Sequence, residues 1–118
     1  MQDNPIIEMK KINNVECLNF VFNGLLTENN AAVAVDKWKQ LLNKNATKIQ
    51  HVWNCKGMTG YEPMARSHWQ RAIKELKGRI DKIWLVSDSA LIITGAKILS
   101  VFTSFDIKTV STEEAIVF

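Results

Sequence analysis

The chain contains few of the residues that cross-link small proteins or interrupt their helices and strands. Its 118 residues include two cysteines, two prolines and five glycines, and 47% of them are hydrophobic. Cys17 and Cys55 lie in strand-like apolar segments, so we expect reduced core thiols rather than the disulfides of a secreted domain. No window reaches the roughly 18 uncharged apolar residues that a membrane-spanning helix requires, and no export signal precedes the first predicted strand. We therefore expect one soluble, cytoplasmic domain over residues 1–118.

Groups that bind metals or carry out catalysis are also few. His51 and Cys55 fall in one predicted strand, where a rise of about 3.3 Å per residue separates them by roughly 13 Å, too far to share one ion. His68 falls on a predicted helix beside Trp69, and we interpret it as a surface or boundary residue. The sequence shows no pair of carboxylates and no nucleophile with an oriented base, the patterns typical of enzymes. We predict no enzyme activity, no metal and no cofactor.

The net charge of +3 is concentrated in the middle of the chain. Residues 28–82 contain eleven Lys and Arg against five Asp and Glu, whereas both ends of the chain are slightly acidic. Such an excess can attract nucleic acid. The basic residues fall on the outer faces of two predicted helices, however, and a solvated helix face is the commoner reason for this pattern. We predict that nucleic acid is not a partner.

Hydrophobic periodicity divides the chain into short strands that alternate with amphipathic helices. The expected order is ββαβαβαβα, with strands over 6–12, 15–22, 48–55, 80–86 and 105–110, helices over 28–45, 63–77 and 90–103, and a final turn or short helix from residue 111. Asn13-Asn14 favours a hairpin turn between the first two strands, and the helices imply parallel crossovers between the later ones. The predicted fold is α/β, a mixed sheet of about five strands with an antiparallel opening hairpin.

An apolar strand gives way to a glycine-containing loop and a Pro-started helix in the segment Ile49–Met64. Ligands and partners of open α/β sheets bind at the carboxyl ends of strands, and loops often carry function. The loop lacks the lysine of a P-loop and the three-glycine spacing of a dinucleotide site, and a plain βα turn would also explain its glycines. The candidate binding residues at this junction are Asn54, Met58, Thr59, Gly60 and Tyr61.

The third predicted helix carries apolar residues on both sides. Its expected core positions are Leu91, Ile92, Gly95, Ile98, Leu99 and Phe102. Ile93 and Val101 fall instead among lysine and serine residues on the other side. An apolar pair on an otherwise polar helix face is often covered by a partner. Ile93 and Val101 therefore mark a candidate homodimer face or a portal for a small apolar ligand.

Three short motifs give the chain a family resemblance. GLLTENN at 24–30 leads into the first helix, VWNCKGMTGYEPMA at 52–65 spans the strand–helix junction, and VSDS at 86–89 ends the fourth strand. Together with the strand order they resemble the STAS domain, and in particular the bacterial anti-sigma factor antagonist-like proteins, over about residues 6–118. The resemblance implies a STAS-like fold and a non-catalytic regulatory domain. It also implies that a protein partner binds through the loop after the third strand and the helix that follows.

Anti-sigma factor antagonists are switched by phosphorylation of a serine at the start of that helix, where a phosphate adds nearly two negative charges. In this chain Asn54 stands where the family has an acidic residue, and the family's Asp-Ser-Ser/Thr-Gly signature is absent. Thr59-Gly60 is the nearest equivalent, so Thr59 is the candidate phosphoacceptor. Lipid-transfer-like relatives of the fold imply an alternative, a module that binds a small apolar ligand or lipid and has no signalling role.

Overall fold

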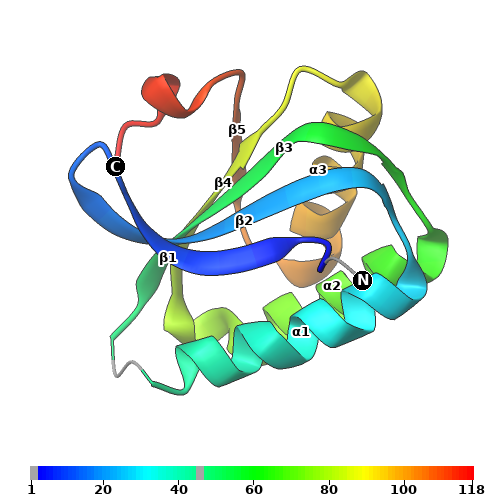
Figure 1. The fold of residues 1–118 in the computed structure, drawn as a ribbon, viewed down its shortest axis with the longest axis horizontal. Coiled ribbons are helices and arrows are strands. Elements are labelled where there is room, and N and C mark those ends of the chain that lie inside the picture. Colours follow the sequence, from blue (N-terminus) through cyan, green and yellow to red (C-terminus); the bar gives the residue numbers. More distant parts are fainter. Residues whose placement is uncertain (1–2, 45–46) are drawn as a thin grey trace.

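The computed structural model describes residues 3–44 and 47–118 and shows a five-stranded sheet with three helices (Figure 1). The elements are β1 (Ile6–Ile12), β2 (Val15–Leu26), α1 (Glu28–Leu42), β3 (Ile49–Tyr61), α2 (Pro63–Leu76), β4 (Ile80–Val86), α3 (Ala90–Thr103) and β5 (Ile107–Val110), with 3-10 turns η1 (Lys77–Arg79) and η2 (Glu113–Ala115). The predicted α/β fold class is confirmed, although the predicted end of the first helix, Asn45, lies outside the described residues. Within the described ranges, no helix is both long and apolar enough to cross a membrane.

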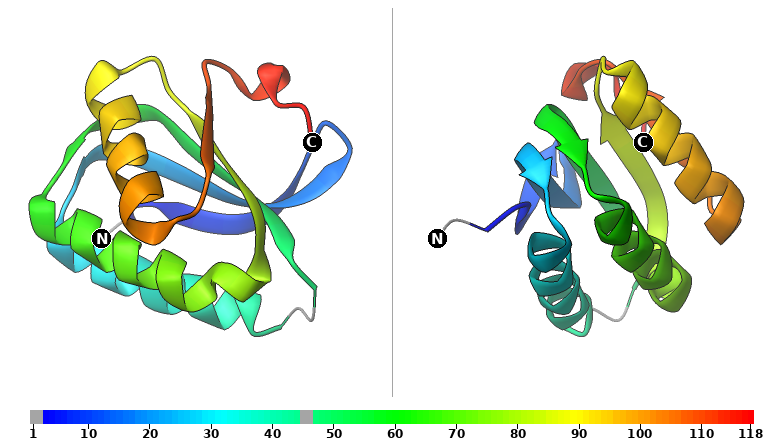
Figure 2. Two further views of the ribbon diagram at one scale, coloured as in Figure 1. Left: turned by 180° about the vertical axis from the view of Figure 1, so that it is seen from behind. Right: turned by 90° about the vertical axis from the view of Figure 1, so that its right-hand side faces the viewer.

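The sheet follows the order of the chain, β1-β2-β3-β4-β5. β1 and β2 pair antiparallel through Asn13 and Asn14, whose φ angles of 50° and 66° lie in the left-handed region that asparagine tolerates. The remaining neighbours pair parallel. Successive crossovers that run in one direction and share one hand place their helices on one side of a sheet. All three helices accordingly pack on the same face (Figure 2).

Aromatic rings form the centre of the core on the helix face. Trp38 of α1 and Trp69 of α2 pack against Phe20 of β2 and Trp53 of β3, with ring centroids 5.1 to 6.2 Å apart. All four side chains are almost fully buried. Since a large aromatic side chain buries about 150–250 Å², these rings supply much of the burial that holds α1 and α2 on the sheet.

The opposite face of the sheet carries a smaller core. Cys17, Val52 and Trp84 are covered by Ile116 and Phe118 of the C-terminal segment, and the rings of Trp84 and Phe118 lie 5.9 Å apart. Burial raises the pKa of the Cys17 thiol to about 11. Both cysteines of the chain are free and buried, as predicted.

His51 is a structural histidine within the helix-face core. Trp38 Nε1 donates a hydrogen bond to His51 Nε2 at 3.0 Å, and His51 Nδ1 donates to the carbonyl oxygen of Ile49 at 2.9 Å, so the neutral ring is fully satisfied. Desolvation lowers the pKa of His51 to about 4, because burial disfavours the charged form. Among residues 3–44 and 47–118, no group of three or more His, Cys, Asp and Glu side chains could hold a metal ion.

Two strands are longer than predicted. β3 continues to Tyr61 and β2 continues to Leu26, each beyond its predicted end. The prediction of a loop over Lys56–Tyr61 is therefore wrong, because the two extensions pair with each other and satisfy backbone groups that a loop would leave to water. The pairing of these extensions is irregular: it contains two register shifts, and Gly24 of β2 has a positive φ angle of +63°. The glycines that suggested a loop belong to this irregular stretch of strand, as glycines at bulges do.

Candidate functional site

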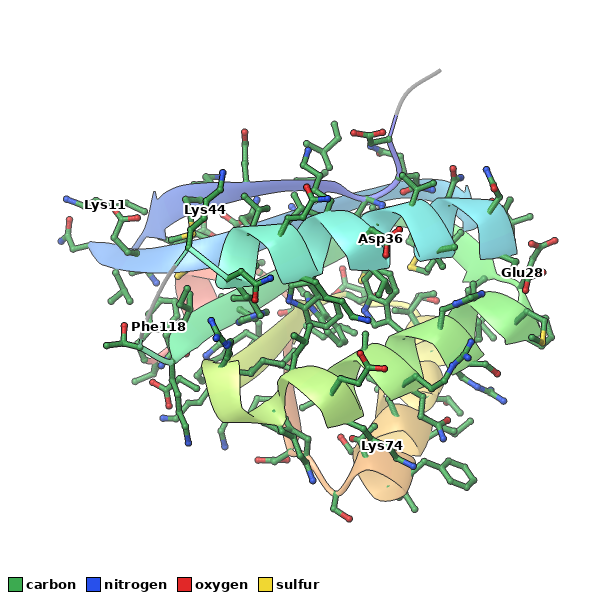
Figure 3. The ribbon with its side chains drawn as sticks, turned by 90° about the horizontal axis from the view of Figure 1, so that it is seen from below. Lys11, Glu28, Asp36, Lys44, Lys74 and Phe118 are labelled. Carbon is green, nitrogen blue, oxygen red and sulfur yellow. The ribbon has the colours of Figure 1, made fainter. Side chains whose placement is uncertain are left out.

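The carboxyl ends of β2 and β3 meet the first turns of α1 and α2 at one end of the molecule. Glu62, between β3 and α2, joins these elements: its backbone N–H donates to the Leu26 carbonyl oxygen at 2.9 Å, and its Oε1 accepts from the Glu28 N–H at 2.7 Å. A carboxylate at a helix N-terminus satisfies a free backbone donor and interacts favourably with the helix dipole. Glu28 lies at this end in Figure 3, whereas Lys11 and Phe118 lie at the opposite end.

An apolar cavity of about 50 Å³ lies between the sheet, α2 and α3. Met58 and Tyr61, near the carboxyl end of β3, form part of its wall. The other lining residues are Phe22, Leu26, Trp53, Cys55, Arg66, Trp69, Leu85, Ile92, Gly95, Ala96 and Leu99. Because most of these side chains belong to the helix-face core, the cavity is a gap in that core close to the carboxyl ends of the strands.

Tyr61 is held between α2 and α3. A Cβ atom added to Gly95 would lie 2.7 Å from the Tyr61 Oη and 3.0 Å from two of its ring carbons, so only glycine lets α3 approach the ring this closely. Arg66 Cζ of α2 lies 6.0 Å from the centroid of the same ring, within the range of a cation–π contact. Gly95 and Arg66 therefore fix the position of a half-buried wall of the cavity.

Besides Tyr61, three lining residues carry polar groups. Trp53 Nε1 is buried and has no hydrogen-bond partner among the described residues, which costs about 1–3 kcal/mol for a buried donor. Arg66 forms no ion pair within the described part of the chain. Burial raises the pKa of the Cys55 thiol to about 12, so at neutral pH this sulfur is not the thiolate that a nucleophile requires. The surface of the cavity is therefore almost entirely apolar.

Two exposed leucines lie outside the cavity at the same end of the sheet. A Cβ atom added to the buried Gly60 would lie 3.7 Å from Leu25 Cδ1 and 3.9 Å from Leu91 Cδ2. Leu25 and Leu91 are 50% and 55% exposed. We call Leu25, Gly60 and Leu91 the edge patch. Met64, which is also half exposed, lies in the first turn of α2 at this end.

The structure separates the five predicted binding residues into different environments. Met58 and Tyr61 line the cavity, and Gly60 lies beneath the edge patch. Thr59 is exposed at a register shift, because Gly60 and not Thr59 continues the pairing with β2. Asn54 lies on the opposite face of the sheet, on the side of Val52, and its Oδ1 accepts from the Lys56 N–H at 3.1 Å. The sheet therefore lies between Asn54 and the cavity.

The burial of α3 differs from the prediction at two expected core positions. Leu91 and Phe102 are exposed, whereas Ala96 and Thr103 are buried in their place. Periodicity could not choose the buried face because this helix is apolar nearly all round. Of the predicted surface pair, Val101 is 77% exposed and Ile93 is half buried.

Sequence reasoning missed three features of the cavity. They are the unpaired indole N–H of Trp53, the contact of Arg66 with Tyr61 and the close approach of α3 at Gly95. Only Gly95 left a usable signal, because a glycine inside an apolar helix often marks a close approach by another element. Neither the unpaired indole N–H of Trp53 nor the contact of Arg66 with Tyr61 leaves a pattern in the sequence.

No protein-family model and no curated protein sequence matches the chain. Solved structures match it well. A protein of the DUF3478 family from Shewanella loihica PV-4, described as uncharacterized and as having a SpoIIAA-like fold, superposes with a TM-score of 0.77 and 13% identity over 97% of this chain and 91% of that chain. The unphosphorylated anti-sigma factor antagonist SpoIIAA superposes with a TM-score of 0.58 and 15% identity over 92% of each chain.

At these identities the likeness establishes the fold. The chain is an α/β protein with a mixed five-stranded sheet and three helices on one face. More narrowly, it has the SpoIIAA-like fold. This confirms, at the level of fold, the resemblance to the STAS-type anti-sigma factor antagonists that the sequence motifs indicated.

Proposed function

We propose that residues 1–118 act as one non-catalytic regulatory domain that binds a protein partner at the carboxyl end of the sheet. The fold supports this proposal because SpoIIAA, which has the same fold, is an anti-sigma factor antagonist. The observation that carries it is the edge patch, where Leu25 and Leu91 both lie close to Gly60 and remain half exposed. Free buried cysteines support a cytoplasmic location.

The surroundings of the edge patch fit a small protein interface. Exposed apolar side chains that cluster beside polar groups mark interaction sites, and interfaces combine an apolar centre with a polar rim. Lys56, within β3, and Asp88, after β4, form an exposed ion pair with Nζ and Oδ2 2.8 Å apart. Met64 extends the apolar surface onto the first turn of α2. Met64 and this ion pair belong to elements at the carboxyl end of the sheet, where we propose that the partner binds.

Paired aspartate substitutions test the proposal. The double variant Leu25→Asp, Leu91→Asp places two charges in the edge patch, and Val33→Asp is the matched control because Val33 of α1 is 54% exposed. Affinity capture from the native cell, quantified by mass spectrometry, should recover a partner with the wild type and with Val33→Asp. Recovery with the double variant should fall at least tenfold, since about 1.4 kcal/mol of lost binding free energy suffices. Equal recovery with all three proteins would contradict the proposal.

Thr59 is proposed as the residue that regulates this binding. Its side chain is exposed next to Gly60, and a phosphate there would bring nearly two negative charges beside an apolar contact. Intact mass of protein purified from its native cell should show a phosphoryl adduct that Thr59→Ala removes. An adduct that persists in Thr59→Ala, or protein that carries none, argues against this switch.

Self-association through α3 is a second proposal, and it involves a different surface. Val101 and Phe102 are both well exposed near the end of this helix, and a second copy could cover them. Light scattering should then show a dimer that Val101→Lys converts to a monomer. A wild-type monomer at millimolar concentration would rule the dimer out.

A further inference from the structure

We infer that two copies of this chain pair through the free edge of β1, with the two strands antiparallel and centred on Met9. β1 pairs with β2 and forms one edge of the sheet. Figure 3 shows it along one side of the molecule, with no other described helix or strand beyond it. The inference does not rest on the proposed partner binding, because β1 contributes no residue to the edge patch.

The hairpin turn determines which backbone groups of β1 face away from β2. A two-residue turn such as Asn13-Asn14, with positive φ at both residues, is closed by hydrogen bonds between its flanking residues, Ile12 and Val15. Backbone direction alternates along a strand, so the even-numbered residues of β1 face β2 and the odd-numbered ones face outward. Asn23, at an odd position of β2, agrees with this order, because its N–H and carbonyl oxygen bond the Asn4 side chain. The outward N–H and carbonyl groups belong to Ile7, Met9 and Lys11.

The charges of β1 select one register for the pairing. Side chains at odd positions face the helices and those at even positions face the other side of the sheet, as Ile7 and Ile12 show. A two-fold axis perpendicular to the sheet must then pass through a residue of β1, so that each face meets the same face of the second copy. An axis through Glu8 or Lys10 would place like charges directly opposite each other, which is destabilising. An axis through Met9 instead places Glu8 of each copy opposite Lys10 of the other.

The same register uses the outward backbone groups and covers exposed apolar side chains. Ile7 comes to lie opposite Lys11 of the second copy, and Met9 lies opposite the same residue of the second copy, so all the outward groups of this strand find partners. Ile6 and Met9 are 43% and 41% exposed. Ile6 comes to lie opposite Ile12 of the second copy. Apolar pairs and opposite-charge pairs both stabilise antiparallel strands.

The lysines of β1 invite the opposite interpretation, because lysines on an edge strand often prevent pairing with another chain. The two interpretations differ in the role of Glu8, which forms no ion pair among the described residues. Lys10 Nζ lies 4.0 Å from Glu113 Oε2, a loose surface ion pair that contributes little. Lys10 is therefore free to pair with Glu8 of a second copy, and a purely protective lysine would not depend on that glutamate.

Two charge-reversal variants test the register. Sedimentation velocity should show the wild type as a dimer at about 1 mM, since small interfaces bind weakly. Glu8→Lys places lysines opposite each other at both charge pairs, and Lys10→Glu places glutamates opposite each other. Each variant alone should dimerise at least about tenfold more weakly than the wild type. An equimolar mixture of the two variants should dimerise as the wild type does, because every lysine then faces a glutamate.

Two controls separate this dimer from other causes of a changed mass. Asp106→Lys makes the same change of net charge as Glu8→Lys, but at an exposed position before β5, and should leave the dimerisation constant unchanged. Val101→Lys, on α3, should also leave it unchanged. A dimer that Val101→Lys abolishes and Glu8→Lys does not would show that the copies associate through α3, and would overturn the inference.

Amide hydrogen exchange followed by ¹⁵N–¹H NMR locates the contact. As the wild type is concentrated, the outward N–H groups of Ile7, Met9 and Lys11 should exchange at least about tenfold more slowly. The N–H groups of Glu8 and Lys10 face β2 already and should change little.

The mixture of variants gives the decisive outcome, because recovery of the dimer by two proteins that each fail alone shows that both are folded. The inference is overturned if the wild type stays a monomer at about 1 mM, or if Glu8→Lys dimerises as well as the wild type. It is also overturned if the mixture does not recover the dimer, or if protection on concentration falls outside β1. Capture of a partner by the edge patch is a separate measurement, so its failure would leave this dimer standing.

Discussion

From Gln50 to Asn54, β3 pairs with β2 without a register shift and most of its side chains are buried, whereas from Cys55 to Tyr61 the pairing shifts register twice and three residues are exposed. The first half contains His51, whose two ring nitrogens are both satisfied. The second half borders a cavity and the edge patch. One strand thus serves as scaffold along its first half, and its second half borders the surface where we propose that a partner binds. Departures from regular packing are expected where proteins bind other molecules.

The largest effect should follow from damage to the scaffold half. Trp38→Ala removes a fully buried ring beside Phe20 and also the donor to His51. We expect the free energy of unfolding, measured with urea, to fall by about 4 kcal/mol. Met64→Ala, at an exposed position, should change it by less than about 0.5 kcal/mol. A loss of under 1 kcal/mol in Trp38→Ala would show that the aromatic cluster is not the main support of α1.

A second large effect should come from acid. In the unfolded chain His51 gains a proton below about pH 6.5, but in the folded protein only below about pH 4. The unfolded state therefore binds more protons in this window, so stability is full above pH 6.5 and falls as the pH drops toward 4, by about 3 kcal/mol in total. His51→Gln cannot gain this proton. The difference between the pH profiles of the two proteins isolates His51, and parallel profiles would refute its neutral, buried state.

A moderate effect is expected where the scaffold meets the binding half. Gly95→Ala drives a methyl group into the Tyr61 ring and should lower the unfolding free energy by about 1–2 kcal/mol. Gly78→Ala is the matched control, because a Cβ atom there meets nothing within 4 Å. This control should be neutral or slightly stabilising. Equal effects of the two substitutions would mean that α3 does not hold Tyr61 closely.

The smallest effect on stability belongs to the edge patch. Leu25→Asp and Leu91→Asp replace half-exposed side chains, so each should change the unfolding free energy by less than about 0.5 kcal/mol. Thermal melts followed by circular dichroism can measure this. If either substitution destabilises the protein as much as Gly95→Ala, the edge patch is part of the scaffold. The contrast between the two halves of β3 would then be wrong.

The sequence predicts the scaffold well, since its signals are periodic and local. The hairpin turn at Asn13-Asn14, the order of the elements and the start of α2 at Pro63 each follow from one residue type or one repeat. The buried tryptophans also follow, because each occupies an apolar position of an amphipathic element. These features depend on neighbours along the chain.

The second half of β3 is predicted less well than the first half. The sequence predicts the change from strand to α2 at Pro63 correctly, but Gly57 and Gly60 suggest a loop where the structure has an irregular strand. Gly57 fits closely against β2, because a Cβ atom there would lie 2.6 Å from the Asn23 Oδ1 and 3.2 Å from the Phe22 carbonyl oxygen. Such a contact joins residues far apart in the chain. For the same reason the sequence does not predict the cavity, whose walls come from elements that include β3, α2 and α3.

Backbone protection on binding tests the central claim most directly. Hydrogen exchange measured by mass spectrometry compares the free protein with the protein bound to its captured partner. We expect slower exchange over residues 56–66 and 89–96, which form the carboxyl end of β3 and the first turns of α2 and α3. Protection confined to α1, β1 or the last residues of the chain would contradict the assignment of the binding site to this end of the sheet.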